Sequence, residues 1–224
     1  FLYALPNFQN PTGVTLSLER RKELIRLADV HGVPILEDDP YGQLRYEGQH
    51  LPPLVTLDAE YRGLPGAGYS GNVIYLSTFS KTLAPGLRLG WIIGPPDVIQ
   101  RLAQAKQGTD LHTSSFTQLM AFEVARSGFL DSHVRILRRA YTERRDAMLS
   151  AMAASFPSSV RWTKPKGGLF VWAIMPEGVD ATELLQRALS EKVAFVPGSA
   201  FYADGSGKNT MRLNFTHRPP KEIA

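Results

Sequence analysis

The chain has 224 residues, of which 43% are hydrophobic and 21% are charged, proportions that are typical of a globular protein. It has no cysteine, which excludes disulfides, thiolate metal sites and cysteine nucleophiles and gives no support for an oxidising compartment. We therefore expect a cytoplasmic location. No apolar run approaches the roughly 20 residues that a membrane-spanning helix needs, so we expect no membrane partner.

The formal net charge of +4 does not by itself indicate a nucleic-acid partner. The densest basic cluster runs from Arg135 to Arg145, and the same helical pattern carries Glu143 and Asp146. Mixed charge of this kind is typical of a helix face in contact with solvent. We interpret the cluster in this way and expect no nucleic-acid groove on it.

Short apolar runs alternate with helical patterns in the first part of the chain. The expected elements are a strand at 1–5, a helix at 17–31 with Ser17 as N-cap and Gly32 as its stop, a strand at 33–36, a surface loop at 58–72, strands at 73–76 and 89–93, and a helix at 97–107. Strands that alternate with helices or long crossovers favour a doubly wound, mainly parallel α/β sheet.

The pattern changes after residue 114. Helices are expected at 114–126, 132–154 and 181–192, with strands at 160–162, 169–173, 194–196 and 211–215. These elements predict a smaller α+β domain, and we place the boundary inside the long helix. Residues 1–140 then form part of a large domain and residues 141–224 a small one. Because the chain begins without Met inside an apolar run, we expect it to be a piece of a longer polypeptide.

Polar side chains follow three predicted strands of the large domain. Asn10 follows the first, Asp38 and Tyr41 follow the second, and Lys81 follows the third, between two apolar runs that we expect to be buried. Ligands of open α/β sheets bind outside the carboxyl ends of the strands, so these residues suggest a shared pocket. Taken singly, each motif could be an ordinary turn, an acidic strand end or a lysine facing solvent. The five histidines have no ligand spacing, so we expect no metal site.

Together the motifs resemble one family. The segments "PNFQNPTG", "EDDPYG", "SKTLAPGLRLGW", "KGGLFVW", "FVPGSAF" and "MRLNF" occur in this order along the chain. They resemble the fold-type I, class I/II aminotransferases, which depend on pyridoxal 5′-phosphate (PLP). These motif sequences are most similar to those of the branch that acts on 2-aminoadipate, aromatic or branched-chain amino acids. The same branch also supplies the effector domain of MocR-type transcription regulators.

The resemblance implies roles around the cofactor ring. Lys81 would bind the cofactor aldehyde covalently, and as a free amine it would then serve as the base that moves a proton. Burial and the like charge of Arg88 would favour the neutral amine that this chemistry needs. Asp38 would pair with the pyridine nitrogen and keep it protonated. Tyr41 and Asn10 would hydrogen-bond the phenolate oxygen.

The resemblance also implies which residues bind the cofactor phosphate and the substrate carboxylate. Thr78, Ser80 and Arg88 would hold the cofactor phosphate, because hydroxyls donate single hydrogen bonds and a guanidinium can donate two. Arg212 of "MRLNF" would bind the substrate α-carboxylate, and Asn10 would be a second substrate-binding residue. The family's upstream phosphate loop and the aromatic side chain that stacks on the ring have no counterpart in this sequence.

The implied activity is an aminotransferase. It would move an amino group from an L-amino acid to a 2-oxo acid in a ping-pong reaction, with 2-oxoglutarate as the expected acceptor, and it would be a homodimer. The alternative is the PLP-binding effector domain of a MocR-type regulator, whose DNA-binding part would lie upstream. The visible motifs do not separate these two hypotheses.

Overall fold

The computed structural model describes residues 1–64 and 68–223. The chain divides into two compact units. The first unit comprises Phe1–Asn7 and Thr15–Leu137, and the second comprises Phe8–Val14 together with the chain from Arg138 onward. A short segment near the N-terminus therefore belongs to the second unit, whereas the sequence interpretation placed it in the large domain. The division into functional domains at residue 140 stays a prediction.

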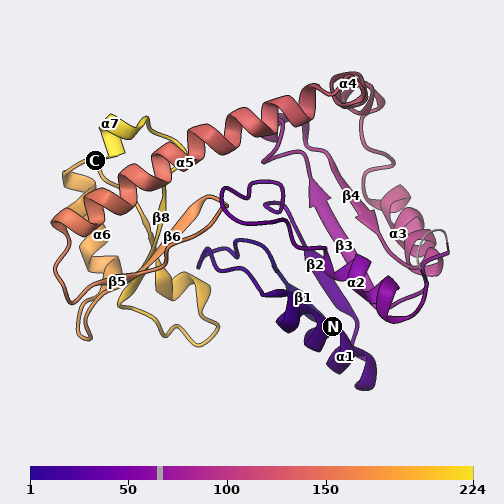
Figure 1. Cartoon of the computed structure of the whole chain (residues 1–224), viewed down its shortest axis with the longest axis horizontal. Coiled ribbons are helices and arrows are strands. Elements are labelled where there is room, and N and C mark those ends of the chain that lie inside the picture. The colour runs from indigo at the N-terminus through magenta and orange to yellow at the C-terminus, as the bar shows by residue number, and fades with distance from the viewer. Residues whose placement is uncertain (65–67, 224) are drawn as a thin grey trace. The chain divides into compact units, whose positions relative to one another are not determined.

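The first unit is built on a four-stranded sheet with the order β1-β2-β3-β4 (Figure 1). Its elements are β1 (Leu2–Ala4), α1 (Leu18–Val30), β2 (Ile35–Asp38), α2 (Leu54–Tyr61), β3 (Val73–Thr78), the 3-10 turn η1 (Pro85–Leu87), β4 (Gly90–Ile93), α3 (Pro96–Thr109) and α4 (Ser115–Arg126). The pairs β1–β2 and β2–β3 are parallel, and β4 is antiparallel to β3. The prediction of a mainly parallel α/β sheet is confirmed.

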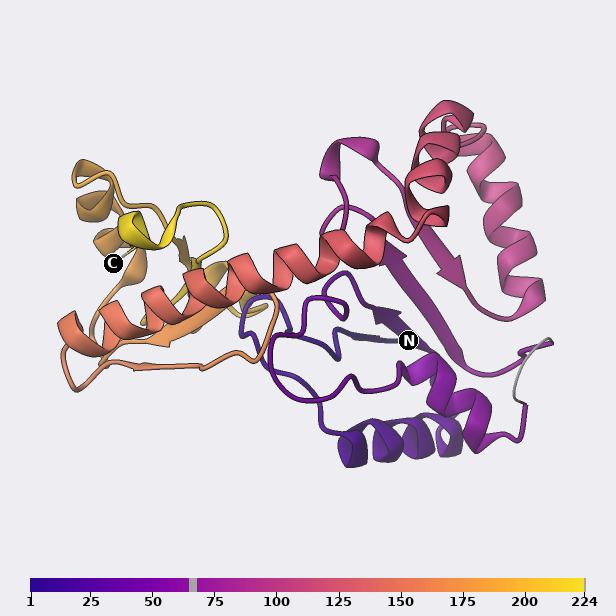
Figure 2. The ribbon, with the colours of Figure 1, turned by 45° about the horizontal axis from the view of Figure 1, so that its top comes forward.

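Helices α1 and α2 lie together on one side of this sheet (Figure 2). Their apolar residues and those of β2 and β3 form one buried core of Ile25, Ala28, Ile35, Leu54, Leu57 and Val73. The hydroxyl oxygen of Ser17 accepts a hydrogen bond from the Arg20 amide at 3.3 Å, so the expected N-cap of α1 is confirmed. Gly32 follows the helix with a positive φ of 61°, a conformation that ends a helix, so the expected stop at Gly32 is also confirmed.

The surface loop expected at 58–72 is wrong over its first part, because Asp58–Tyr61 belongs to α2. Asp58 is only 1% exposed. Its carboxylate accepts hydrogen bonds from Arg62, the hydroxyl of Tyr69 and the amide of Asn72. Helix α2 has no local N-cap, since Pro53 offers no side-chain acceptor. The carboxylate of Glu37 in β2 accepts the amides of Leu54 and Val55 instead. Residues 65–67 of the expected loop lie outside the described residues.

The burial expected for the run at 89–93 is also wrong in part. Leu89 is buried, but Trp91, Ile92 and Ile93 of β4 are 38%, 43% and 48% exposed. The strand is the last of its sheet. Among the described residues of the first unit, its side chains thus remain open to solvent on an apolar edge.

The second unit has an antiparallel sheet with the order β5-β6-β8-β7. Its elements are the long helix α5 (Phe129–Ser155), within which the chain passes from the first unit to the second, β5 (Arg161–Trp162), β6 (Phe170–Ile174), α6 (Ala181–Ser190), β7 (Val196–Pro197), the 3-10 turn η2 (Gly198–Phe201), β8 (Thr210–Asn214) and α7 (Pro220–Ile223). The α+β pattern expected after residue 140 is present here. Strand β6 lies in the middle of the core, with four of its five residues buried.

The basic cluster on α5 is not solvated throughout. Arg135 and Arg139 are exposed as expected, but Arg145 is only 5% exposed. Its guanidinium donates to the Pro165 carbonyl at 3.0 Å and pairs with Asp146. The long aliphatic stem of arginine can be buried when its charged end has partners, so this part of the helix packs against its own unit. Within the described ranges, no helix combines the length and apolar character that a membrane crossing needs.

Candidate active site

The acidic tripeptide Glu37-Asp38-Asp39 divides between the two faces of the first sheet. Successive side chains of a strand point to opposite faces. Glu37 and Asp39 are buried, on the side that α1 and α2 cover, whereas Asp38 is half-buried. In the register of the parallel pair, Tyr3 stands opposite Leu36, which is two residues before Asp38. Tyr3 and Asp38 therefore lie on the same face.

The side chains on this face contact one another at the end of β2. The Tyr3 hydroxyl donates to Asp38 Oδ2 at 2.5 Å. Partial burial and the adjacent Asp38 carboxylate raise the pKa of Tyr3 well above its ordinary value, and nearby Tyr41 adds to the shift. Tyr41 itself is only 6% exposed. The structure thus brings together two residues that the sequence singled out, Asp38 and Tyr41, and adds Tyr3 to them.

The loop after β3 folds back on β4 through the hydroxyl of Thr78. This hydroxyl lies 2.9 Å from Ser80 Oγ and donates to the Leu89 carbonyl at 2.7 Å. The amide of Phe79 donates to the same carbonyl at 3.2 Å. Thr78 and Phe79 are therefore fixed to Leu89, the residue that follows Arg88, and the half-buried Lys81 comes two residues after Phe79. Thr78 is two residues beyond Leu76, which pairs with Asp38, so Thr78 and Asp38 lie on the same sheet face.

Arg88 has an unusual backbone conformation. It is an exposed residue that follows η1 with φ 53° and ψ 39°, in the left-handed region. For a residue with a side chain this costs on the order of 1 kcal/mol, and such residues cluster at ligand sites. Its guanidinium donates to the Pro85 carbonyl at 3.1 Å. The conformation turns the chain sharply between the loop and β4, and it supports a functional role for this position.

The other two predicted residues meet in the second unit. Arg212 of β8 donates from Nη1 to Asn10 Oδ1 at 2.7 Å, although 202 positions separate them. The guanidinium carbon lies 4.3 Å from the ring centroid of Phe170 and 5.2 Å from that of Phe201. Contacts between a cation and an aromatic face stabilise the charge and limit its motion. Arg212 is thus a positioned cation, which suits the binding of a carboxylate.

Two glycines hold the Asn10 loop in this unit. Gly13 has φ 70°, and a Cβ there would lie 2.7 Å from the Phe170 carbonyl oxygen. Gly168 has φ 74°, and a Cβ there would lie 2.4 Å from Cβ of Phe8, which is buried. Both positions therefore require glycine. The motifs "NPTG" and "KGGLFVW" are two halves of one packing arrangement, and the Asn10–Pro11 peptide within it is cis.

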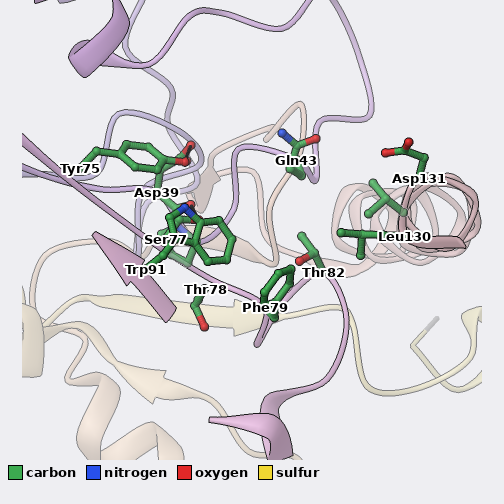
Figure 3. A pocket seen from close by; sticks show the side chains of 12 residues that line it. Asp39, Gln43, Tyr75, Ser77, Thr78, Phe79, Thr82, Trp91, Leu130 and Asp131 are labelled. Atoms are coloured by element: carbon green, nitrogen blue, oxygen red, sulfur yellow. Dashed lines mark hydrogen bonds between the residues drawn. The ribbon is translucent and has the colours of Figure 1, made fainter. Parts of the chain in front are cut away.

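A cavity of about 350 Å³ in the first unit has Asp39, Tyr75, Ser77 and Trp91 in its lining (Figure 3). Of the predicted site residues only Thr78 lines it. Burial raises the pKa of Asp39, against the effect of the hydrogen bond that it accepts from Asn7. The cavity thus shares Thr78 with the predicted cofactor site, and the other predicted cofactor residues do not line it.

The sequence analysis missed a buried polar network on the sheet face opposite Asp38. Arg21 is fully buried, and its guanidinium donates to the carbonyls of Leu16, Pro52 and Pro6 and to Asn7 Oδ1. Asn7 in turn donates to Asp39 at 2.9 Å. One signal could have revealed Arg21, which stands at an apolar helical position, three residues after Leu18 and four before Ile25. Tyr3 could have been found from the alternation of β1, which places it on one face.

Among the described residues there is no cluster of three or more side chains that could hold a metal ion. The strand ends and loops of the first unit carry a carboxylate, phenols, hydroxyls and an amine. In the second unit an amide and a guanidinium are hydrogen-bonded to each other.

Comparison with known proteins gives a consistent result. The sequence model of the family "Aminotransferase class I and II" matches residues 3–224. Aromatic-amino-acid aminotransferase 1 of Thermococcus litoralis is 48% identical over 222 residues, which cover 99% of this chain and 51% of that protein. The crystal structure of LysN, the alpha-aminoadipate aminotransferase of Thermus thermophilus, complexed with N-(5′-phosphopyridoxyl)-L-leucine, matches with a TM-score of 0.92 and 44% identity, over 100% of this chain and 56% of that one.

A regulator is also among the relatives. The uncharacterized HTH-type transcriptional regulator YisV of Bacillus subtilis is 37% identical over 216 residues, which cover 96% of this chain and 42% of that protein. The chain thus spans about half the length of the relatives it matches. The match to the family model extends over nearly every residue, and the solved neighbours share the fold of PLP-dependent aminotransferases. The chain belongs to the class I and II aminotransferase family.

Proposed function

We propose that the chain carries the cofactor-binding and carboxylate-binding residues of a PLP-dependent aminotransferase. The observation that supports this most is the placement of Asp38 and Thr78 on one face of the first sheet, at the carboxyl ends of β2 and β3, with Lys81 three residues further on. That edge of a parallel sheet is where α/β proteins bind their ligands.

The residues at this edge suit the chemical groups of PLP. Thr78 and Ser80 offer hydroxyls within 2.9 Å of each other, and Arg88 offers a guanidinium on the same loop, which together can bind a phosphate. Asp38 offers a carboxylate for the pyridine nitrogen, and the buried Tyr41 offers a phenol for the ring oxygen. When bound, PLP supplies an aldehyde for covalent attachment and a protonated ring that withdraws electrons.

The chain's own residues would then perform three tasks. Lys81 Nζ holds the cofactor and, once free, accepts and returns the proton at the substrate Cα. Asp38 stabilises the positive charge on the ring nitrogen. Arg212, held by Asn10 and by two aromatic rings, binds the α-carboxylate that the amino acid and the oxo acid have in common. A single carboxylate site can therefore serve both halves of a ping-pong reaction.

The substrate proposal follows the relatives. An aromatic-amino-acid aminotransferase and an alpha-aminoadipate aminotransferase are each more than 40% identical to this chain. We infer an amino donor of the 2-aminoadipate, aromatic or branched-chain type and 2-oxoglutarate as the acceptor. The homodimer and the cytoplasmic location implied by the resemblance are part of the same proposal.

A regulatory effector domain is the second candidate. It is supported by the relative that is named a transcriptional regulator and is 37% identical to this chain. The two proposals differ in one measurable property, because only the enzyme is expected to sustain amino transfer. Turnover of an amino donor by the natural full-length protein would decide in favour of the enzyme.

The test begins with the purified holoenzyme. Borohydride reduction followed by peptide mapping should place the cofactor on Lys81, and Lys81→Ala should abolish glutamate formation from a panel of amino donors and 2-oxoglutarate. Label on another residue would overturn the assignment of Lys81. Arg212→Ala should raise KM for every amino donor, and an unchanged KM would overturn its role in carboxylate binding.

A further inference from the structure

Tyr3 makes a side-chain contact to Asp38 that the sequence did not suggest. Its hydroxyl donates to Asp38 Oδ2 at 2.5 Å. The two side chains come from neighbouring parallel strands, β1 and β2, and stand diagonally on the same face. A carboxylate has two oxygens, so this hydrogen bond leaves Oδ1 to accept a second donor.

We propose that Tyr3 is a positioning residue, which orients the Asp38 carboxylate so that its other oxygen can pair with the ring nitrogen of the cofactor. This inference rests on the proposed function, in which Asp38 binds that nitrogen. Tyr3 touches neither substrate nor reacting atoms in this arrangement and acts through Asp38 alone.

Two further observations favour this role over a purely structural one. Tyr3 is 52% exposed, so its ring contributes little to the core. The raised pKa of Tyr3 keeps the phenol protonated, and therefore a hydrogen-bond donor, at neutral pH. A protonated donor on an exposed edge strand is well suited to hold one rotamer of a carboxylate.

The experiment compares cofactor affinity in wild type and Tyr3→Phe, which removes only the hydroxyl. The cofactor-stripped full-length protein is titrated with PLP and with an analogue that has carbon in place of the ring nitrogen. We expect Tyr3→Phe to weaken PLP binding about tenfold, the usual effect of losing a hydrogen bond to a charged group. Affinity for the analogue should change less than about twofold, since it cannot use Asp38 in the same way.

Two controls sharpen the result. Tyr75→Phe removes a hydroxyl that faces Asp39, on the same sheet and beside the same tripeptide, and it should leave the affinity for both compounds unchanged. In the Asp38→Asn background, Tyr3→Phe should cause no further loss of PLP affinity, because the two residues act as one unit.

The outcomes are distinct. Equal loss of both compounds in Tyr3→Phe, or no loss of either, would overturn the role of Tyr3 while leaving Asp38 in place. If Asp38→Asn binds PLP as tightly as wild type, the proposed function of Asp38 fails, and the role of Tyr3 fails with it. A selective loss of PLP in Tyr3→Phe that disappears in the double variant supports the proposal.

Discussion

The two faces of the first sheet use neighbouring carboxylates in opposite ways. Glu37 is fully buried and accepts the amides of Leu54 and Val55 at 2.8 and 3.0 Å, so it caps helix α2. Asp38, one residue later, is half-buried on the other face and accepts a phenol of an exposed edge strand. One carboxylate is used to build the fold, and the next is left with an oxygen for a ligand.

The difference shows that exposure and the type of hydrogen-bond partner distinguish an acid that stabilises the fold, such as Glu37, from an acid that is available to a ligand, such as Asp38. A fully buried carboxylate whose two oxygens both accept backbone amides is satisfied inside the fold and is out of reach of a ligand. A shift of one residue in the register of β2 would exchange the two roles, because every side chain would change face. The side-chain alternation of β2 is therefore as important for the site as the identity of its residues.

The largest effect is expected on the face of the sheet that carries Asp38. Asp38→Asn keeps the shape of the side chain but removes its charge, so kcat should fall by about 10²–10³, as when one preorganised electrostatic contact is lost. The free energy of unfolding should change by less than about 0.5 kcal/mol, since Asp38 is not part of the core. Steady-state kinetics and urea denaturation measure the two quantities, and a stability loss as large as the kinetic one would contradict the comparison.

On the opposite face, the buried Glu37 should make the free energy of unfolding depend on pH. Burial raises the pKa of Glu37 from its ordinary value of 4.5 to about 7, although the two amides act in the other direction. The folded protein therefore binds a proton that the unfolded chain releases between about pH 4.5 and 7, and the stability due to this group falls as pH rises through that window. The fall amounts to about 3 kcal/mol at roughly 1.4 kcal/mol per pH unit.

The measurement compares wild type with Glu37→Gln, which cannot titrate. The difference in their free energies of unfolding should change by this amount between about pH 4.5 and 7.5 and stay constant outside the window. A difference that does not depend on pH would show that the Glu37 carboxyl has an ordinary pKa in the folded state.

Much of this arrangement could be predicted from the sequence, but not all. The succession of strands and helices along the chain and the N-cap at Ser17 follow from local patterns of apolar and capping residues, and Asp38 and Tyr41 follow from motif spacing. Helix α2 could not be predicted, because its cap is Glu37, seventeen residues before the amide of Leu54. The exposure of β4 was missed because an apolar run predicts burial, whereas exposure depends on what packs against the strand.

A smaller effect is expected in the network behind the buried acids. Asn7→Ala removes both the acceptor of Arg21 and the donor to Asp39, which leaves buried polar groups without this partner. The expected loss is about 2 kcal/mol in the free energy of unfolding. Turnover at saturating substrate should fall less than about threefold at a temperature where the variant is folded. Unchanged stability would mean that the network does not support this face.

The smallest effect compares the two tyrosines that face the tripeptide. Tyr75 approaches Asp39 at 3.4 Å, a long hydrogen bond, and burial together with the Asp39 charge raises its pKa to about 12. Tyr75→Phe should therefore lower the free energy of unfolding by less than about 1 kcal/mol and leave kcat unchanged, because a long bond to a buried acid adds little. Tyr3→Phe, by contrast, should lower the affinity for PLP and hardly change the free energy of unfolding. If Tyr75→Phe weakened PLP binding as much as Tyr3→Phe does, the two faces of the sheet would not be functionally distinct, and the distinction between the buried acids and Asp38 would be wrong.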